Sequence, residues 1–198
     1  MDKALDLENI KEKILISNLP LKETSKNLVF GKGNSNAEIM FIGEAPGEKE
    51  DEQGIPFVGS AGKELDKLLS LIGLKIEDVY IANILKYRPP ENRNPNIEEI
   101  ESHTPYLVEQ IRVIKPKIII TLGNYSTKFV LSSFNLEKMK SIPGITSLHG
   151  KVNKLKINDL DVLVIPVFHP AAMLYNPSLR KILENDFIEI KKTLENMK

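Results

Sequence analysis

The sequence predicts an α/β fold, a three-layer α/β/α domain with a central four-stranded parallel sheet. Continuous apolar runs, rich in Ile, Val, Leu and Phe, are typical of strands that helices cover on both faces. Helical patterns fall between these runs, which is the order expected of repeated β-α units. The 198 residues are the size of one domain, so we expect residues 1–198 to form a single domain. The four runs are Ala37–Gly43, Val79–Leu85, Lys117–Gly123 and Val162–Phe168.

Five amphipathic segments are predicted to be helices, and one of them precedes the first strand. The segment after the first strand places three leucines and Ile72 on one stripe, which is the apolar face of a helix against a sheet. Pro177 stands just before the last segment and is a plausible start signal. In chain order the segments are Leu5–Ile16, Ser60–Ile72, Ile97–Ile114, Asn124–Leu131 and Ser178–Asn196.

Composition excludes several classes of site. The chain has no cysteine, so disulfides, thiolate nucleophiles and cysteine-bound clusters are impossible. His103, His149 and His169 are too scattered to suggest zinc, and we expect no metal and no cofactor. A net charge of zero disfavours coating of nucleic acid by bulk charge but permits local contacts to a few phosphates.

The chain has no long apolar run and no apolar signal segment, so we expect no membrane contact and a cytoplasmic protein. We also expect a monomer. In parallel sheets the ligand lies beyond the carboxyl ends of the strands. Polar and turn-forming groups follow each run there: Gly43–Gly47, Lys86–Pro90 after Asn83, Gly123-Asn124 and His169-Pro170.

The longest motif is the loop Gly43–Gly62, GEAPGEKEDEQGIPFVGSAG. Its alternative interpretation is a simple connection rich in turn residues, although loops of this length are usually functional. A phosphate loop is disfavoured because Gly-Lys-Ser/Thr and GxGxxG are both missing. The loop resembles the first motif of the family 4 uracil-DNA glycosylases. The resemblance covers roughly residues 16 to 190 and continues through Tyr80–Lys86, Arg88–Pro95, Pro116–Gly123 and His169–Leu174.

This resemblance implies a monofunctional DNA glycosylase of base excision repair. Such an enzyme hydrolyses the N-glycosidic bond of deoxyuridine in single- or double-stranded DNA, after the base has been flipped out of the stack. By resemblance, Phe57 stacks on uracil, Asn83 reads its edge, and His169, neutral or protonated, donates to O2. The structural alternatives are a core phenylalanine, a turn asparagine and a satisfied core histidine.

Further residues match family positions near the reacting centre. Glu44 or Asn92 is expected to orient the water, because Ala45 stands where other branches carry an aspartate. Glu50 is expected to help exclude the 5-methyl group of thymine. The alternative for these carboxylates is a solvated loop.

DNA contacts are expected from the arginines of the Arg88–Pro95 motif, Arg88 and Arg93. The segment after His169 is expected to be an exposed loop that acts as a DNA wedge, as apolar side chains do in kinked duplexes. Its members are Met173, Leu174 and Tyr175. The alternative is that Leu174 packs under the loop.

Family 4 members bind a [4Fe–4S] cluster through four cysteines, and this chain departs from that pattern. The resemblance places Ile16, Leu19, Tyr87 and His103 at the four cluster positions. Without a thiolate the cluster cannot be held in the family's way. We expect the four positions to lie together and to fill the vacated volume with ordinary packing.

Three other functions stay open at this level. A DNA-binding relative that has lost catalysis is disfavoured by His169. A superfamily member acting on another deaminated or mispaired base is disfavoured by Asn83. A small-molecule nucleotide-binding protein is disfavoured by the missing phosphate loop.

Overall fold

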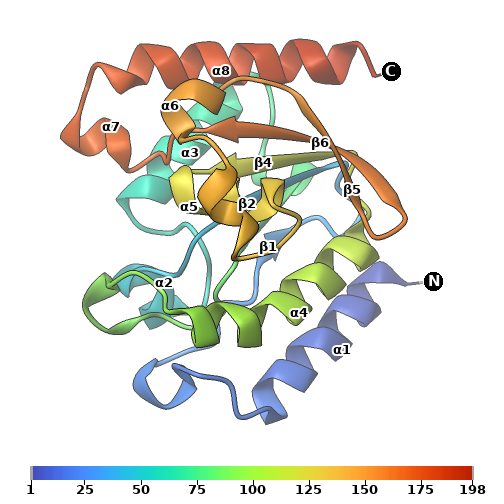
Figure 1. The fold of residues 1–198 in the computed structure, drawn as a ribbon, viewed down its shortest axis with the longest axis vertical. Coiled ribbons are helices and arrows are strands. Elements are labelled where there is room, and N and C mark those ends of the chain that lie inside the picture. The colour runs from blue at the N-terminus through green and yellow to red at the C-terminus, as the bar shows by residue number, and fades with distance from the viewer. Residues whose placement is uncertain (1, 198) are drawn as a thin grey trace.

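The computed structural model describes residues 2–197. They form a mixed α/β fold around one six-stranded sheet with the order β1-β3-β2-β4-β6-β5 (Figure 1). The four predicted strands are its parallel centre. The strands are β1 (Lys32–Gly33), β2 (Ile39–Gly43), β3 (Val79–Asn83), β4 (Ile118–Leu122), β5 (Asn153–Ile157) and β6 (Leu160–Val167).

The prediction of a four-stranded, all-parallel sheet is therefore wrong at both edges. β1 pairs with β3 and β5 pairs with β6, both antiparallel. β1 is only two residues long, which leaves no apolar pattern to detect. β5 exposes Lys154 and Lys156 on one face, so its alternation lacks the continuous apolar run that marks the central strands.

Helices pack on both faces of the sheet, because side chains on successive strand residues point to opposite faces. On one side, Met40 and Ile42 of β2 pack with the buried residues of α1 (Lys3–Ile16), α4 (Ile97–Ile114) and α5 (Asn124–Leu131). On the other, Ile39 and Phe41 pack with α3 (Ser60–Leu71) and α8 (Leu179–Glu195). Figure 1 shows α8 on one side of the sheet and α1 with α4 on the other.

The five predicted helices are all present, and the predicted bounds of α4 and α5 match the structure. Asn96 caps α4 by accepting the Glu99 N–H, and the Glu99 carboxylate accepts the Asn96 N–H in return. No helix within residues 2–197 is long and apolar enough to cross a membrane. Shorter helices not predicted are α2 (Glu48–Gln53), α6 (Ile145–Leu148), α7 (Ala172–Tyr175) and the 3-10 turns η1 (Lys22–Thr24), η2 (Ile76–Asp78), η3 (Pro90–Asn92) and η4 (Lys138–Ser141).

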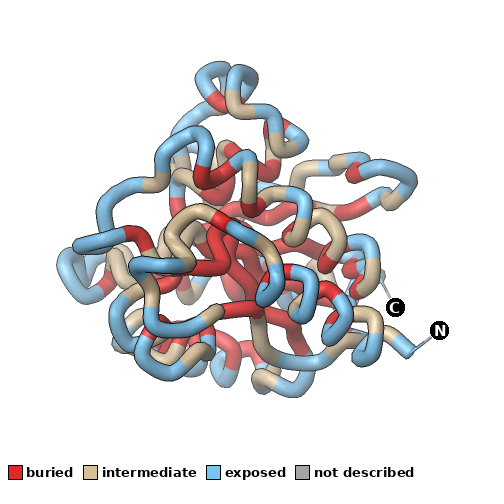
Figure 2. The backbone as a smooth tube through the Cα atoms, turned by 90° about the horizontal axis from the view of Figure 1, so that it is seen from below, coloured by how far each residue is buried: buried red, intermediate tan, exposed pale blue. Residues whose placement is uncertain are grey.

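The central strands lie in the interior and the connecting segments lie at the surface. Figure 2 shows the strands as a buried centre surrounded by exposed loops. Every residue of β2, β3 and β4 is buried. A rigid centre of this kind fixes the directions in which the loops leave the carboxyl ends of β2, β3 and β6.

Candidate active site

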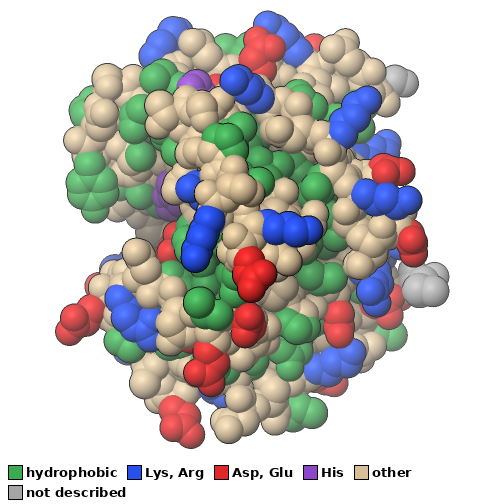
Figure 3. Space-filling model, in the orientation of Figure 1, with side chains coloured by type: hydrophobic (Ala, Val, Ile, Leu, Met, Phe, Trp, Pro, Cys, Tyr) green, Lys and Arg blue, Asp and Glu red, His purple; other side chains and the backbone are tan. Residues whose placement is uncertain are grey.

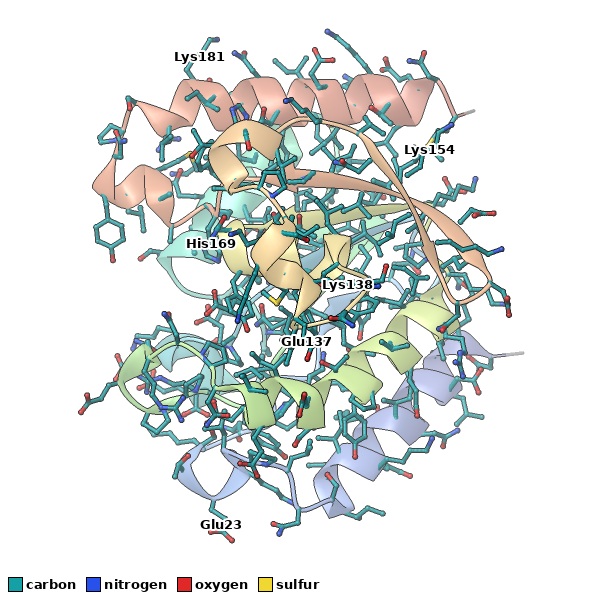
Figure 4. The ribbon with its side chains drawn as sticks, viewed as in Figure 1. Glu23, Glu137, Lys138, Lys154, His169 and Lys181 are labelled. Atoms are coloured by element: carbon teal, nitrogen blue, oxygen red, sulfur yellow. The ribbon has the colours of Figure 1, made fainter. Side chains whose placement is uncertain are left out.

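A small cavity of about 170 Å³ lies at the carboxyl ends of the parallel strands. Its walls come from the segment after β2, from the end of β3 and from the segment after β6. Figure 4 shows His169 at this end of the sheet, the end where α7 also lies. The cavity is lined by Ala45, Gly47, Glu50, Phe57, Ala61, Asn83 and His169.

Asn83 presents an unpartnered donor to this cavity. It is the last residue of β3, pairs with Gly43 of β2 and is buried. Its side-chain Nδ2 is fully buried and has no hydrogen-bond partner within residues 2–197. A buried donor without a partner costs about 1–3 kcal/mol. The cost is recovered when a ligand in the cavity offers an acceptor to Nδ2.

Gly43 makes room for this arrangement. A Cβ built on Gly43 would overlap with Oδ1 of Asn83 and would lie 2.9 Å from Cζ of the Phe57 ring. Both side chains therefore lie directly over the Gly43 backbone. Only glycine at this position lets the asparagine amide and the aromatic ring share one end of the cavity.

Phe57 is held in an uncommon backbone conformation. Its φ of 52° is left-handed, which costs a bulky residue about 1–3 kcal/mol. The Lys32 ammonium donates to the Phe57 carbonyl oxygen at 3.0 Å. The next two amides, of Val58 and Gly59, donate to Oε1 of Glu50 at 2.9 and 2.8 Å. These bonds fix the ring against the cavity.

His169 lies opposite this ring. The Phe57 and His169 rings are stacked, with centroids 5.8 Å apart and planes inclined by 27°. The Ala171 N–H donates to His169 Nδ1 at 3.2 Å, so in the neutral imidazole the proton is assigned to Nε2. Burial lowers the pKa of His169 to about 4, although the Glu50 carboxylate acts in the opposite direction. At neutral pH the site therefore holds a neutral imidazole with one N–H donor.

The structure brings together four of the six predicted catalytic and base-binding residues: Glu50, Phe57, Asn83 and His169 line the cavity. Glu44 and Asn92 do not line it. Burial raises the pKa of Glu44, and burial together with this carboxylate raises the pKa of Tyr125 on α5. Asn92 is exposed, and its Oδ1 accepts a hydrogen bond from Arg88 Nε at 2.8 Å.

The two predicted DNA-contacting arginines occupy the exposed segment around η3. Arg93 donates both Nη groups to the Glu99 carboxylate, and it contacts one oxygen at 2.9 Å. Arg88 Nε donates a hydrogen bond to Asn92, and the main-chain N–H of Arg88 donates to the Ser25 hydroxyl at 3.0 Å. Both guanidinium groups thus have protein partners, and Arg93 has an acidic one.

The predicted wedge forms the short helix α7, and only part of it is exposed. Leu174 is 45% exposed and Tyr175 is 88% exposed. Met173 is 3% exposed and packs in the same core cluster as Leu183 and Phe187 of α8. The expectation that Met173 lies on an exposed loop is wrong, because helix α7 turns its side chain inward. Figure 3 shows a notch in the molecular outline between the α7 side and the α2 side.

Three of the four former cluster positions are buried. Leu19 and Tyr87 belong to one core cluster, and His103 is fully buried. The Tyr87 and His103 rings contact each other edge to face, with centroids 6.1 Å apart. Ile16 is 86% exposed at the end of α1, so the expectation that it fills the vacated volume is wrong. Its helix buries the stripe Leu7, Ile10 and Ile14, from which Ile16 is offset.

The residues at these positions do not fit an iron–sulfur cluster. The chain has no thiolate, and both ring nitrogens of His103 are engaged. The Lys86 N–H donates to Nδ1 at 2.9 Å, and Nε2 lies 3.1 Å from the Pro20 carbonyl oxygen. Since Nδ1 accepts, Nε2–H is the donor to Pro20. Burial lowers the pKa of His103 to about 4, so the neutral ring makes both bonds.

A family model for the uracil DNA glycosylase superfamily matches residues 30–195, which include every residue that lines the cavity. The chain belongs to this superfamily. A type-4 uracil-DNA glycosylase of Saccharolobus solfataricus is 52% identical over 172 residues, or 86% of this chain and 78% of the relative. One from Archaeoglobus fulgidus is 48% identical over 170 residues, covering 86% and 83%. A third, from Sulfurisphaera tokodaii, is 46% identical over 188 residues, covering 94% and 84%.

Two residues of this superfamily member were missed at the sequence level. Lys32 lies between Gly31 and Gly33, both with positive φ, and this Gly-Lys-Gly spacing was the available signal. Lys86 belongs to a motif that the sequence already marks, but nothing in the sequence shows that its side chain is buried. Both lysines donate to main-chain carbonyl oxygens of residues that line the cavity.

Proposed function

We propose that this chain is a uracil-DNA glycosylase of base excision repair. It hydrolyses the N-glycosidic bond of deoxyuridine in DNA, releases uracil and leaves an abasic site. The observation that carries the proposal is that Asn83 lines a small cavity and that its buried Nδ2 has no hydrogen-bond partner within residues 2–197. At about 170 Å³ this cavity is below the 300–1,000 Å³ typical of pockets for drug-sized ligands, and it suits a single base.

Asn83 supplies the base selectivity in this proposal. Its Nδ2 donates to uracil O4 and its Oδ1 accepts from N3–H. Cytosine presents an amino donor and a bare ring nitrogen at the same positions, so both contacts fail. Phe57 offers its ring as the stacking surface, and its clamped backbone keeps that ring in place before the base arrives.

His169 stabilises the charge that develops on the leaving base. As the glycosidic bond breaks, the sugar gains oxocarbenium character and negative charge builds on uracil O2. A neutral imidazole with its proton on Nε2 is a preorganised donor to that oxygen. Such donors act most strongly in the transition state, where the charge is largest. The low pKa of His169 keeps the donor neutral, so the donor itself needs no proton uptake.

Glu44, Asn92 and Glu50 are each assigned one supporting role in the reaction. Glu44 or Asn92 orients the attacking water, and Glu50 excludes the 5-methyl group of thymine. Glu50 is the one of the three that lines the cavity. Its Oε1 is occupied by two backbone amides, which supports a fixed wall facing the base.

The substrate is uracil-containing DNA, single- or double-stranded. Leu174 and Tyr175 of α7 fill the gap left by the flipped base, and Arg88 contacts the DNA backbone. Exposed apolar side chains beside a base pocket suit the role of a wedge. We further propose that residues 1–198 act as one domain, as a monomer and in the cytoplasm.

Release of uracil from a defined strand tests this function. Purified protein is incubated with a labelled oligonucleotide that contains one uracil, and alkali then cleaves the abasic sites. Strand scission at the uracil position, and none with cytosine or thymine there, is the expected result. Scission at hypoxanthine instead of uracil would favour a superfamily member with another base preference. DNA binding without scission would favour an inactive relative.

A further inference from the structure

Lys86 is a fully buried lysine just behind the cavity. It follows β3 by three residues, and its side chain is among the largest with no exposed surface. Its Nζ donates to the Asn83 carbonyl oxygen at 2.8 Å and to Gln110 Oε1 at 2.6 Å. The lysine side chain thus folds back onto the residue whose amide faces the cavity.

The second acceptor, Gln110, is itself fixed. Gln110 lies on α4 and is fully buried. Its Nε2 donates to the Phe30 carbonyl oxygen at 3.0 Å and lies 3.2 Å from the Tyr80 hydroxyl. With Nε2 engaged in this way, Oε1 must face Lys86. The glutamine therefore anchors the lysine to the helix layer.

The main chain of Lys86 is held as firmly as its side chain. Its N–H donates to His103 Nδ1 at 2.9 Å, and its carbonyl oxygen accepts the Val29 N–H at 2.9 Å. All four polar contacts of this residue therefore go to buried or partly buried groups. These contacts restrain both the main chain and Nζ of Lys86, and they hold Nζ next to the Asn83 carbonyl oxygen.

No carboxylate within residues 2–197 forms an ion pair with Lys86. Burial lowers its pKa to about 7, so ammonium and amine forms both occur near neutral pH. Either form has enough N–H groups for both bonds. A fully buried lysine without an acidic partner is unfavourable for folding, and an apolar side chain of similar size would fill the volume without that cost.

We propose that Lys86 is a positioning residue for Asn83, fixing its main chain at the end of β3 so that the side-chain amide faces the base. This inference rests on the proposed function. Within residues 2–197, Nδ2 of Asn83 has no hydrogen-bond partner that would orient the amide before substrate arrives. The bond from Nζ to the Asn83 carbonyl oxygen supplies that orientation through the backbone, and α4 holds Nζ through Gln110.

The test separates positioning from folding with a paired substitution. Lys86→Met alone leaves Gln110 Oε1 buried without a donor, which is destabilising. The double variant Lys86→Met/Gln110→Met removes that orphaned acceptor but also the donor to the Phe30 carbonyl oxygen, so part of the lost stability is expected to return. The bond to Asn83 stays broken in both variants.

Single-turnover uracil cleavage is expected to fall about 10- to 100-fold in the double variant, as small misplacements near a reacting group do. Free uracil is expected to bind more weakly as an inhibitor. Binding to DNA with a tetrahydrofuran abasic-site analogue is expected to stay within about threefold, because that ligand has no base for Asn83 to read. Tyr80→Phe is the matched control, since it removes a hydroxyl at the far end of the same network and is expected to keep the wild-type rate.

A folded double variant with the wild-type cleavage rate would overturn the inference. If the double variant does not fold, Gln110→Met decides, because it removes the anchor of Nζ on α4 while Lys86 itself is kept. Its cleavage rate is expected to fall about three- to tenfold, and a folded Gln110→Met protein with the wild-type rate and wild-type inhibition by uracil would overturn the inference. Failure of the wild-type chain to release uracil would instead refute the proposed function, which keeps the two outcomes distinct.

Discussion

The Lys32 ammonium donates a hydrogen bond of 3.0 Å to the carbonyl oxygen of Phe57. This bond ties the edge strand β1 to the ring that lines the cavity. It also supports a peptide in which Phe57 has positive φ. The edge strand thus serves the site as well as the sheet.

Replacing Lys32 with methionine is expected to release this support. The Phe57 loop then relaxes from its strained conformation, which costs about 1–3 kcal/mol to maintain. We expect kcat for uracil release to fall about tenfold with a smaller change in thermal stability. Steady-state kinetics and melting curves measure the two effects. Lys32→Arg keeps a donor and is expected to recover most of the rate; equal rates for the methionine and arginine variants would contradict a role for the hydrogen bond.

The Asn83→Asp substitution tests base reading. An ionised carboxylate cannot donate to O4, so uracil cleavage is expected to fall by about 10²-fold or more. A protonated carboxyl donates to cytosine N3 and accepts from its 4-amino group, so slow cytosine cleavage is expected. Oligonucleotides with one uracil or one cytosine measure both rates. Unchanged uracil cleavage would remove Asn83 from this role.

His169→Ala is expected to reduce the single-turnover rate by about 10²–10³, the usual effect of losing one charge-stabilising donor. Since burial lowers the pKa of His169 to about 4, protonation of this ring should not affect the rate between pH 8 and 5. His169→Gln keeps an N–H donor and serves as the matched variant. A loss of less than threefold in the alanine variant would exclude His169 from the catalytic step.

The exposed and buried residues of α7 are expected to behave differently. Leu174→Ala and Tyr175→Ala should reduce cleavage of double-stranded substrate more than single-stranded substrate, because only a duplex leaves a gap to fill. Met173→Ala should instead lower the free energy of unfolding by about 2–5 kcal/mol. Comparing both substrates with urea unfolding separates the roles. Equal losses on both substrates for Leu174→Ala and Tyr175→Ala would refute the wedge.

His103 is expected to make stability depend on pH. Its folded pKa of about 4 lies below the ordinary value of 6.5, so the unfolded chain binds a proton that the folded chain does not. Stability therefore falls as pH drops from about 6.5 to 4, by up to about 3 kcal/mol for this ring. Urea unfolding at pH 7 and pH 5 measures the effect, and His103→Gln should reduce it.

Some pH dependence is expected to remain in the His103→Gln variant, because burial also lowers the pKa of His169. The missing cluster is tested separately. Purified protein is expected to be colourless, and its melting temperature is expected to be unaffected by chelators. A chelator that lowers the melting temperature would show that a metal supports this region after all.

The sequence predicted the centre of the fold better than its edges. Continuous burial left a clear apolar signal in β2, β3 and β4, whereas β1 and β5 pair on one side only and left none. For the site, the motifs identified Phe57, Asn83 and His169, and all three line the cavity. Roles assigned by resemblance remain predictions that the variants above test.

The errors concern where side chains point. Met173 and Ile16 each lie in or next to a helical segment, and one turn of a helix decides whether such a residue is buried or exposed. Glu44 and Asn92 lie in the predicted motifs but do not line the cavity, and their roles stay predictions. Sequence spacing specifies neither the direction of a loop side chain nor the tertiary contact that holds it.

The bare backbone of Gly43 makes this chain vulnerable to a very small change. One added methyl group would displace the Asn83 amide and the Phe57 ring together, while most of the sheet and its helices would have no reason to rearrange. Glycine and alanine codons differ at a single base. One point mutation at this codon is thus expected to give a folded protein that no longer removes uracil from DNA.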